Sequence, residues 1–172
     1  MIKEYIRTVP DYPVVGVNFY DMNSLFASPV WHDCVTHFSN VLPDKFKHIT
    51  HIVGIESRGF VVGAAIAHAM NLPFVMLRKK GAKYPGTLLE ESYDLEYGTD
   101  SLVLQEGILG HTSRVVIADD LIATGGSAIA ASNVCRQTGA NVIGLVAPIN
   151  LVYLNSPELE HYKIFTLEEI RT

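Results

Sequence analysis

Two adjacent carboxylates followed by a glycine-rich turn are the feature of this sequence with the clearest chemical meaning. Residues 114–131, RVVIADDLIATGGSAIAA, pass from an apolar strand pattern through Asp119 and Asp120 into a turn that opens a helix pattern. Glycines let a ligand approach the backbone, and free N–H groups at a helix N-terminus bind phosphate without a lysine. The turn residues expected to contact phosphate are Ala123, Thr124, Gly125, Gly126 and Ser127.

The paired acids indicate that the ligand has a second group besides phosphate. Carboxylates do not bind phosphate, but they accept hydrogen bonds from vicinal hydroxyls. A ribose that carries a 5-phosphate would satisfy Asp119 and Asp120 together with the turn. A plain capped helix start is the alternative, and a lone TGGS turn would favour it. No G-x-x-x-x-G-K-[ST] and no strand-linked G-x-G-x-x-G is present, so nucleoside triphosphatases and dinucleotide dehydrogenases lack their hallmark.

The elements around this motif alternate between strand and helix patterns, which is typical of an α/β fold with a mostly parallel sheet flanked by helices. The pattern predicts strands over residues 51–56, 73–77, 114–119 and 141–147 and an edge strand over 162–167. It predicts helices over residues 58–70 and 127–137. Ligands of such sheets bind beyond the carboxyl ends of the strands, where the acidic pair would lie.

Two further segments do not follow this alternation. Pro10, Pro13 and Gly16 punctuate an irregular N-terminal segment, which precedes an amphipathic helix expected over residues 31–42. Residues 78–98 are too long for an ordinary connection, and a functional lid is favoured over structureless filler. We expect one domain over residues 1–172.

Composition limits the classes of protein. The chain has 172 residues, 48% of them hydrophobic, and a net charge of -5, so it can bury one core and does not suggest a nucleic-acid coat. No stretch resembles a signal peptide or a membrane span, so we expect a cytoplasmic protein without membrane contact. Cys34 and Cys135 fall in apolar segments and do not indicate a disulfide framework.

Several separated motifs carry a family resemblance. VVIADDLIATGGSA is similar to the phosphoribosyl pyrophosphate (PRPP) signature of type I phosphoribosyltransferases. IVGIESRGF, FVMLRKKG and YDLEYGT extend the match in order and spacing, and together they resemble adenine phosphoribosyltransferases. The resemblance implies the type I phosphoribosyltransferase fold, with a base-binding hood over about residues 1–35 and a flexible lid over about residues 79–100. It also implies purine salvage, in which adenine and PRPP give AMP and pyrophosphate.

The resemblance assigns roles to further residues. Ser57 and Arg58, at a strand-to-helix junction, would bind pyrophosphate, and Arg78 and Lys79 would add positive charge there. The pyrophosphate set is Ser57, Arg58, Arg78 and Lys79. The lid would bring Tyr97 and a catalytic acid or base, Glu96, over the purine. Without the family resemblance, the sequence of this segment favours a plain surface hairpin. The base would bind at Val17, Asn18, Phe19 and Tyr20, with Phe19 stacking on it.

The chain departs from the family at two places. Tyr20 stands where the family usually has arginine, and GAKYPG carries an extra residue. A 6-oxopurine or xanthine phosphoribosyltransferase therefore remains an alternative, as does a non-catalytic PRPP-sensing regulator, although no DNA-binding segment supports the latter. The family further implies a homodimer and Mg²⁺ held mainly by PRPP and water rather than directly by protein residues.

Overall fold

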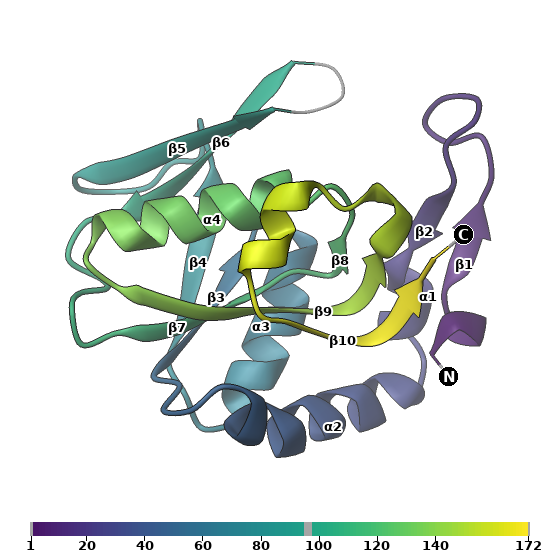
Figure 1. The fold of residues 1–172 in the computed structure, drawn as a ribbon, viewed down its shortest axis with the longest axis horizontal. Coiled ribbons are helices and arrows are strands. Elements are labelled where there is room, and N and C mark those ends of the chain that lie inside the picture. Colours follow the sequence, from purple (N-terminus) through teal and green to yellow (C-terminus); the bar gives the residue numbers. More distant parts are fainter. Residues whose placement is uncertain (1, 95–97, 172) are drawn as a thin grey trace.

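A central sheet organises the molecule (Figure 1), and the computed structural model describes residues 2–94 and 98–171. Within these residues the strand order is β10-β9-β7-β3-β4-β6-β5, with β8 paired to β9. The strands from β10 to β4 are parallel to their neighbours, whereas β6 is antiparallel to β4 and β5. The sheet strands are β3 His51–Ile55, β4 Phe74–Lys79, β5 Leu88–Asp94, β6 Thr99–Gln105, β7 Arg114–Ala118, β8 Leu121–Ile122, β9 Asn141–Leu151 and β10 Ile164–Ile170. The predicted mostly parallel sheet is confirmed.

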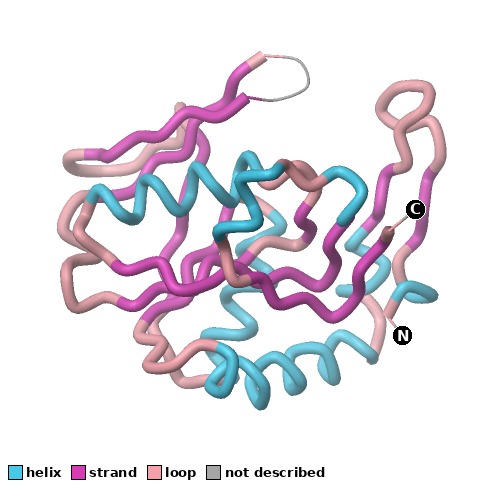
Figure 2. The backbone as a smooth tube through the Cα atoms, in the orientation of Figure 1, coloured by secondary structure: helices cyan, strands magenta, loops and turns pink. Residues whose placement is uncertain are grey.

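Helices cover both faces of the sheet because alternate residues of its strands are apolar on each side (Figure 2). Helix α4, Gly126–Gln137, lies on the face to which Ile117 belongs. Helices α2, Val30–Lys45, and α3, Arg58–Ala69, lie on the face of the neighbouring Val116. The flanking helices expected from the sequence are therefore present.

Element ends differ from the sequence expectation where pairing extends a strand. β9 continues to Leu151 because its second half pairs with both β8 and β10 and stays buried. β4 includes Arg78 and Lys79 because both pair with β6, a strand that the sequence pattern did not predict. The edge strand is confirmed as β10.

The N-terminal segment is a hairpin rather than an irregular run. β1, Arg7–Val9, pairs antiparallel with β2, Phe19–Asp21, and the prolines and Gly16 lie in the loop between them. A short 3₁₀ helix, η1 Lys3–Tyr5, precedes β1, and α1, Met22–Phe26, follows β2. We call residues 7–21 the N-terminal hairpin.

The predicted lid is largely regular structure. β5 and β6 pair over seven positions, from Leu88↔Gln105 to Asp94↔Thr99, and form an antiparallel hairpin that extends the sheet. Only Arg78 and Lys79 of β4 pair with β6. Because a long two-stranded ribbon is joined to the parallel sheet by this short pairing, the hairpin projects beyond the sheet (Figure 1). The lid itself stays a prediction, because strand pairing does not test whether the segment moves.

After β9 the chain crosses back over the turn that opens α4. This C-terminal crossing contains two 3₁₀ helices, η2 Val152–Leu154 and η3 Pro157–His161, before β10 begins. The N–H of Ser156 donates to the carbonyl of Thr124 over 3.1 Å. The glycine-rich turn is therefore backed by a second segment of the chain.

Candidate active site

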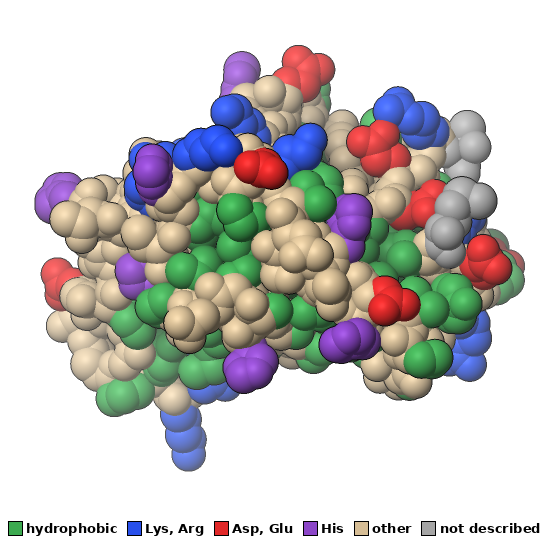
Figure 3. Space-filling view, turned by 90° about the horizontal axis from the view of Figure 1, so that it is seen from below, with side chains coloured by type: hydrophobic (Ala, Val, Ile, Leu, Met, Phe, Trp, Pro, Cys, Tyr) green, Lys and Arg blue, Asp and Glu red, His purple; other side chains and the backbone are tan. Residues whose placement is uncertain are grey.

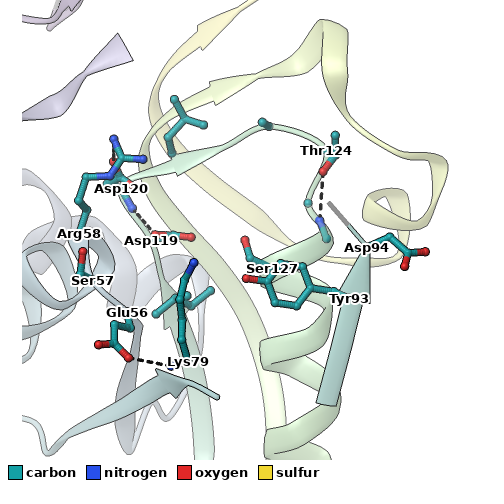
Figure 4. A pocket seen from close by; sticks show the side chains of 15 residues that line it. Glu56, Ser57, Arg58, Lys79, Tyr93, Asp94, Asp119, Asp120, Thr124 and Ser127 are labelled. Carbon is teal, nitrogen blue, oxygen red and sulfur yellow. Dashed lines mark hydrogen bonds and ion pairs between the residues drawn. The ribbon is translucent and has the colours of Figure 1, made fainter. Parts of the chain in front are cut away.

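A cavity of about 600 Å³ lies at the carboxyl ends of β3, β4 and β7 (Figure 4). Its wall consists of the β3–α3 turn, the end of β4, the end of β5, and the segment from Asp119 to Ser127. These strands are parallel or adjacent in one sheet, so their ends meet at a single edge. The predicted position of the ligand site, beyond the carboxyl ends of the strands, agrees with this cavity.

Helix α3 begins unusually close to the acidic pair, which we define as Asp119 and Asp120. A Cβ on Gly59 would lie 2.8 Å from the carbonyl oxygen of Ala118 and 3.0 Å from Oδ1 of Asp119. Only glycine allows the first turn of α3 to approach the end of β7 this closely. The turn that precedes α3, which contains a cis peptide bond between Glu56 and Ser57, is thereby held against the acidic pair.

In the acidic pair, Asp120 is buried, whereas Asp119 is half-buried and lines the cavity. Asp120 is 4% exposed, and its N–H donates to Oδ1 of Asp119 over 2.9 Å. Burial raises the pKa of Asp119 well above its ordinary value, and the charge of Asp120 raises it further. Burial also raises the pKa of Asp120, although the nearby Arg58 guanidinium opposes the shift. The pair therefore holds a proton more readily than two exposed aspartates.

This raised pKa has a consequence for stability. A carboxyl that binds a proton more tightly when folded stabilises the fold most below its ordinary pKa of 3.8, and that contribution is lost as the pH rises through the folded value. Asp119→Asn removes the repelling charge and keeps an oxygen for the N–H of Asp120. We expect its melting temperature to exceed that of the wild type by about 2–4 °C at pH 7, which corresponds to about 1 kcal/mol.

The expected pH dependence supplies the check. The difference in melting temperature between Asp119→Asn and the wild type should shrink toward pH 4, because the wild-type carboxyl is then protonated. Differential scanning calorimetry at pH 7 and at pH 4 measures both values. An equal difference at the two pH values would show that charge repulsion at Asp119 is not its cause.

The glycine-rich turn has the geometry of an anion site. Gly125 adopts φ +89°, and a Cβ there would lie 2.5 Å from atoms of Leu159 in η3, so no other residue fits without displacement. Helix α4 begins at the next residue, and the first N–H groups of a helix have no partner within it. The Ser127 side chain points into the cavity (Figure 4). The turn thus offers N–H and hydroxyl donors to a bound group.

Arg58 connects the acidic pair with the N-terminal hairpin. Its Nη1 lies 3.1 Å from Oδ2 of Asp120, and its guanidinium lies over the Phe19 ring, 5.6 Å from the centroid. Tyr12 contacts the other side of this arrangement, with its ring edge-on to Phe19 at 5.2 Å. Arg58 lines the cavity with Ser57, but its side chain lies at the Phe19 end of the acidic pair.

The four residues predicted to contact the base lie in two parts of the N-terminal hairpin: Val17 and Asn18 in its loop, and Phe19 and Tyr20 in β2. Val17 already uses both backbone groups in the loop, since its N–H donates to Val14 and its carbonyl accepts from Tyr12. The Phe19 ring contacts the guanidinium of Arg58, and Arg58 in turn lines the cavity. Tyr20 packs against the buried cluster that contains Ile149 and Leu151, and its pKa is raised by burial and by the neighbouring Tyr153 of the C-terminal crossing. Asn18 lies in the loop just before β2.

The two cations at the end of β4 lie on opposite faces, because side chains alternate along a strand. Lys79 points into the cavity (Figure 4), and its Nζ lies 2.8 Å from Oδ2 of Asp100. Arg78 instead pairs with Glu56 over 3.4 Å and lies over the Tyr84 ring. The structure therefore brings Lys79 to the other predicted site residues and leaves Arg78 behind Glu56.

Other cavity residues escaped the sequence reasoning. Tyr93 and Asp94 line the wall from β5, and burial, together with the charge of Asp100, raises the pKa of Tyr93 to about 12. Burial raises the pKa of Glu56, but the Lys79 N–H and the Arg78 guanidinium outweigh it and lower that pKa overall. An assignment of β5 and β6 from the alternating pattern of residues 88–105 would have found Tyr93 and Asp100.

The cavity geometry does not bear on the predictions for the lid residues, metal binding and membrane contact. Glu96 and Tyr97 fall outside the described residues. Within residues 2–94 and 98–171, no group of three or more His, Cys, Asp or Glu side chains could hold a metal ion. Across the same residues, no helix is long and apolar enough to span a bilayer.

Comparison with known proteins decides the family. The phosphoribosyl transferase domain family matches residues 28–170, a range that contains every segment of the cavity wall. Adenine phosphoribosyltransferase from Rhodospirillum rubrum is 44% identical over 158 residues, which cover 91% of this chain and 91% of that protein. The chain belongs to the adenine phosphoribosyltransferase family. The resemblance inferred from separated motifs is confirmed.

Solved structures of this family share the whole fold. Adenine phosphoribosyltransferase from Saccharomyces cerevisiae, in complex with D-2,5-dideoxy-2,5-imino-altritol 1,6-bisphosphate and adenine, is 34% identical and has a TM-score of 0.89, covering 97% of this chain and 96% of that chain. The enzyme from Trypanosoma brucei, in complex with AMP, pyrophosphate and ribose-5-phosphate, is 26% identical with a TM-score of 0.81. It covers 98% of this chain and 78% of that chain. The type I phosphoribosyltransferase fold predicted for this family member is confirmed.

Proposed function

We propose that this phosphoribosyltransferase transfers the 5-phosphoribosyl group of PRPP to adenine in purine salvage and releases AMP and pyrophosphate. The observation that carries the proposal is the cavity in which the acidic pair lies between an anion-binding helix start and the cations Arg58 and Lys79. A sugar with a phosphate at one end and a diphosphate at the other matches this order of groups. Relatives crystallised with adenine, or with AMP and pyrophosphate, support the same substrates here.

In this proposal each part of PRPP has its own partners. The 5-phosphate binds to the turn 123–127, where backbone N–H groups and the hydroxyls of Thr124 and Ser127 donate hydrogen bonds. The ribose hydroxyls donate to the acidic pair. The diphosphate binds to the β3–α3 turn at Ser57 and Arg58 and to Lys79. Arg78 was predicted here as well, and its place behind Glu56 limits it to an indirect contribution through that carboxylate.

The chemistry follows from the order of these groups. As the bond from the ribose C1 to the diphosphate oxygen lengthens, its electron pair leaves with pyrophosphate and positive charge develops on the sugar. Carboxylates beneath the ring stabilise that charge, and N9 of adenine forms the new bond to C1. Glu96 stays our candidate for the acid or base at the purine. Water would also capture the sugar cation, so closure of the segment 79–100 would serve the reaction.

Magnesium fits this site as a partner of the substrate. Asp119, Asp120 and Glu56 provide carboxylate oxygens, the ligand type that Mg²⁺ prefers, but the described residues contain no cluster able to hold the ion alone. We therefore propose that PRPP and water supply most ligands of the ion. When bound, Mg²⁺ neutralises charge on the departing pyrophosphate.

We further propose a cytoplasmic homodimer that binds neither nucleic acid nor membrane. Val61 of α3 is 44% exposed and Met76 of β4 is 41% exposed, and such apolar surface suits a second copy of the chain. On the face seen in Figure 3, hydrophobic side chains gather near the centre and charges of both signs are scattered. The free cysteines Cys34 and Cys135 are buried, as suits a reducing compartment.

The choice of base is tested by turnover. We expect adenine to have a higher kcat/KM than hypoxanthine, guanine or xanthine in a PRPP-dependent assay. Adenine presents a donor beside a ring acceptor, whereas 6-oxopurines present the reverse, and each unmatched buried group costs about 1–3 kcal/mol. Phe19→Ala should raise KM for adenine about tenfold or more through lost stacking. KM for PRPP should change far less.

A matched variant separates stacking from simple loss of the hairpin. Phe19→Tyr keeps an aromatic ring and should retain adenine use near the wild-type level. Faster turnover of hypoxanthine or guanine than of adenine would overturn the base assignment and leave a 6-oxopurine phosphoribosyltransferase. Binding of PRPP without turnover of any base would favour the PRPP-sensing regulator instead.

A further inference from the structure

Three neighbouring strands place an acid beside a lysine and a phenol that line the cavity, Lys79 and Tyr93. Lys79 of β4, Asp100 of β6 and Tyr93 of β5 lie on the sheet face that α4 covers, as the register and the burial of their neighbours indicate. Nζ of Lys79 lies 2.8 Å from Oδ2 of Asp100, and the Tyr93 hydroxyl donates to the same oxygen over 3.3 Å. The N–H of Ser101 donates to the other oxygen over 2.8 Å.

A carboxylate at this place opposes the proposed ligand. Asp100 is charged at neutral pH, because its pKa is lowered by Lys79 in the first place and also by the bonds from Ser101 and Tyr93, which outweigh burial. A negative charge beside the lysine that is proposed to bind a diphosphate weakens that binding. The Lys79 side chain is 50% exposed, so its ion pair contributes little to folding. A role in stability alone does not account for the arrangement.

The bonds of Asp100 make the ion pair easy to exchange. When Lys79 leaves, the carboxylate still accepts from the Tyr93 hydroxyl and the Ser101 N–H, so it is not stranded without donors. Tyr93 remains a neutral donor because its pKa is about 12. Lys79 carries its charge on a flexible stem and points into the cavity (Figure 4).

We infer that Asp100 is a positioning residue which holds Lys79 in the free enzyme and releases it to the diphosphate when PRPP binds. The inference rests on the proposed function, in which Lys79 contacts the diphosphate. After the reaction, Asp100 competes for Lys79 again and weakens the hold on pyrophosphate. The exchange thereby assists release of this product.

Calorimetric titration of the full chain with sodium pyrophosphate and magnesium chloride tests the exchange in a double-mutant cycle. Asp100→Asn keeps one oxygen to accept from the Ser101 N–H and removes the competing charge, and should lower the Kd for pyrophosphate about two- to fivefold. Lys79→Ala should raise the Kd about tenfold. Adding Asp100→Asn to Lys79→Ala should then have almost no effect, because there is no lysine to release.

A matched control removes the same charge from the cavity wall. Asp94 lines the cavity and its carboxylate points away from Lys79 (Figure 4), so any effect of Asp94→Asn should be the same with and without Lys79. An equal effect of Asp100→Asn in the wild type and in Lys79→Ala would show that Asp100 acts only by repelling pyrophosphate through space. That result would overturn the exchange. Weaker pyrophosphate binding by Asp100→Asn would overturn it too.

The assay of turnover separates this inference from the proposed function. If the wild type forms AMP and the cycle is additive, the exchange alone fails. If the wild type neither binds pyrophosphate nor uses PRPP, the proposed function fails and the exchange fails with it.

Discussion

Replacing both members of the acidic pair, Asp119→Asn with Asp120→Asn, is expected to lower kcat/KM for PRPP roughly 100- to 1,000-fold. Each hydrogen bond from a ribose hydroxyl to a charged acceptor is worth about 1.5–3 kcal/mol, and about 1.4 kcal/mol corresponds to a factor of ten. The variant also loses the negative charge that stabilises the sugar in the transition state. Pyrophosphate release followed continuously with adenine as the base measures the loss.

The fold of this double variant should persist, because asparagine keeps the shape of the side chain and relieves the repulsion between the two carboxylates. Its melting temperature should therefore equal or exceed that of the wild type at pH 7. Asp94→Asn is the control for loss of one charge from the cavity wall, and its kcat/KM should fall less than tenfold. Nearly normal turnover by the folded double variant would remove the ribose-binding role of the pair.

The second large effect is expected for Gly125→Ala. The new methyl group must occupy space within 2.5 Å of Leu159 while the residue keeps φ +89°, a conformation that costs a non-glycine residue about 1–2 kcal/mol. The turn should shift and misplace the donors proposed for the 5-phosphate. We expect the Kd for AMP to rise about 10- to 100-fold, measured by titration calorimetry, because a shift of about 1 Å is enough to break such contacts.

Two variants accompany this experiment. Gly110→Ala adds the same methyl group where nothing lies within 4 Å and φ is not left-handed, so AMP binding should be unchanged. Gly125→Ala with Leu159→Ala removes the overlap but not the backbone strain and should recover part of the affinity. Wild-type affinity for AMP in a destabilised Gly125→Ala variant would show that the turn supports the fold without binding the phosphate.

The centre of the site was predictable because its signals are local. The strand that ends at Ala118, the acidic pair and the helix that begins at Gly126 follow one another in the chain, and each has a recognisable pattern. Ser57 and Arg58 were found in the same way, at the junction of β3 and α3. Such strand–turn–helix units are specified by neighbouring residues.

The periphery was not predictable because it depends on pairing between distant residues. Arg78 and Lys79 are adjacent in the sequence, and only their place in β4 shows that one faces Glu56 and the other the cavity. The contact of Asp100 with Lys79 requires the register of β6 against β4. The position of Tyr20 beside Tyr153 likewise joins residues far apart in the chain. A local pattern can indicate a strand, but it does not identify the distant strand with which that strand pairs.

The contact between Gly59 and the end of β7 divides the enzyme into parts that differ in evolvability. No methyl group fits between α3 and the acidic pair, so neither segment can drift without the other, and natural variation there should be confined to paired changes. The N-terminal hairpin contacts this centre through Arg58, and the β5–β6 hairpin, whose Leu102 and Leu104 are buried in the core, contacts it through Lys79. A laboratory selection for a new base should therefore accumulate substitutions in the hairpins and leave the β3–α3 and β7–α4 junctions unchanged.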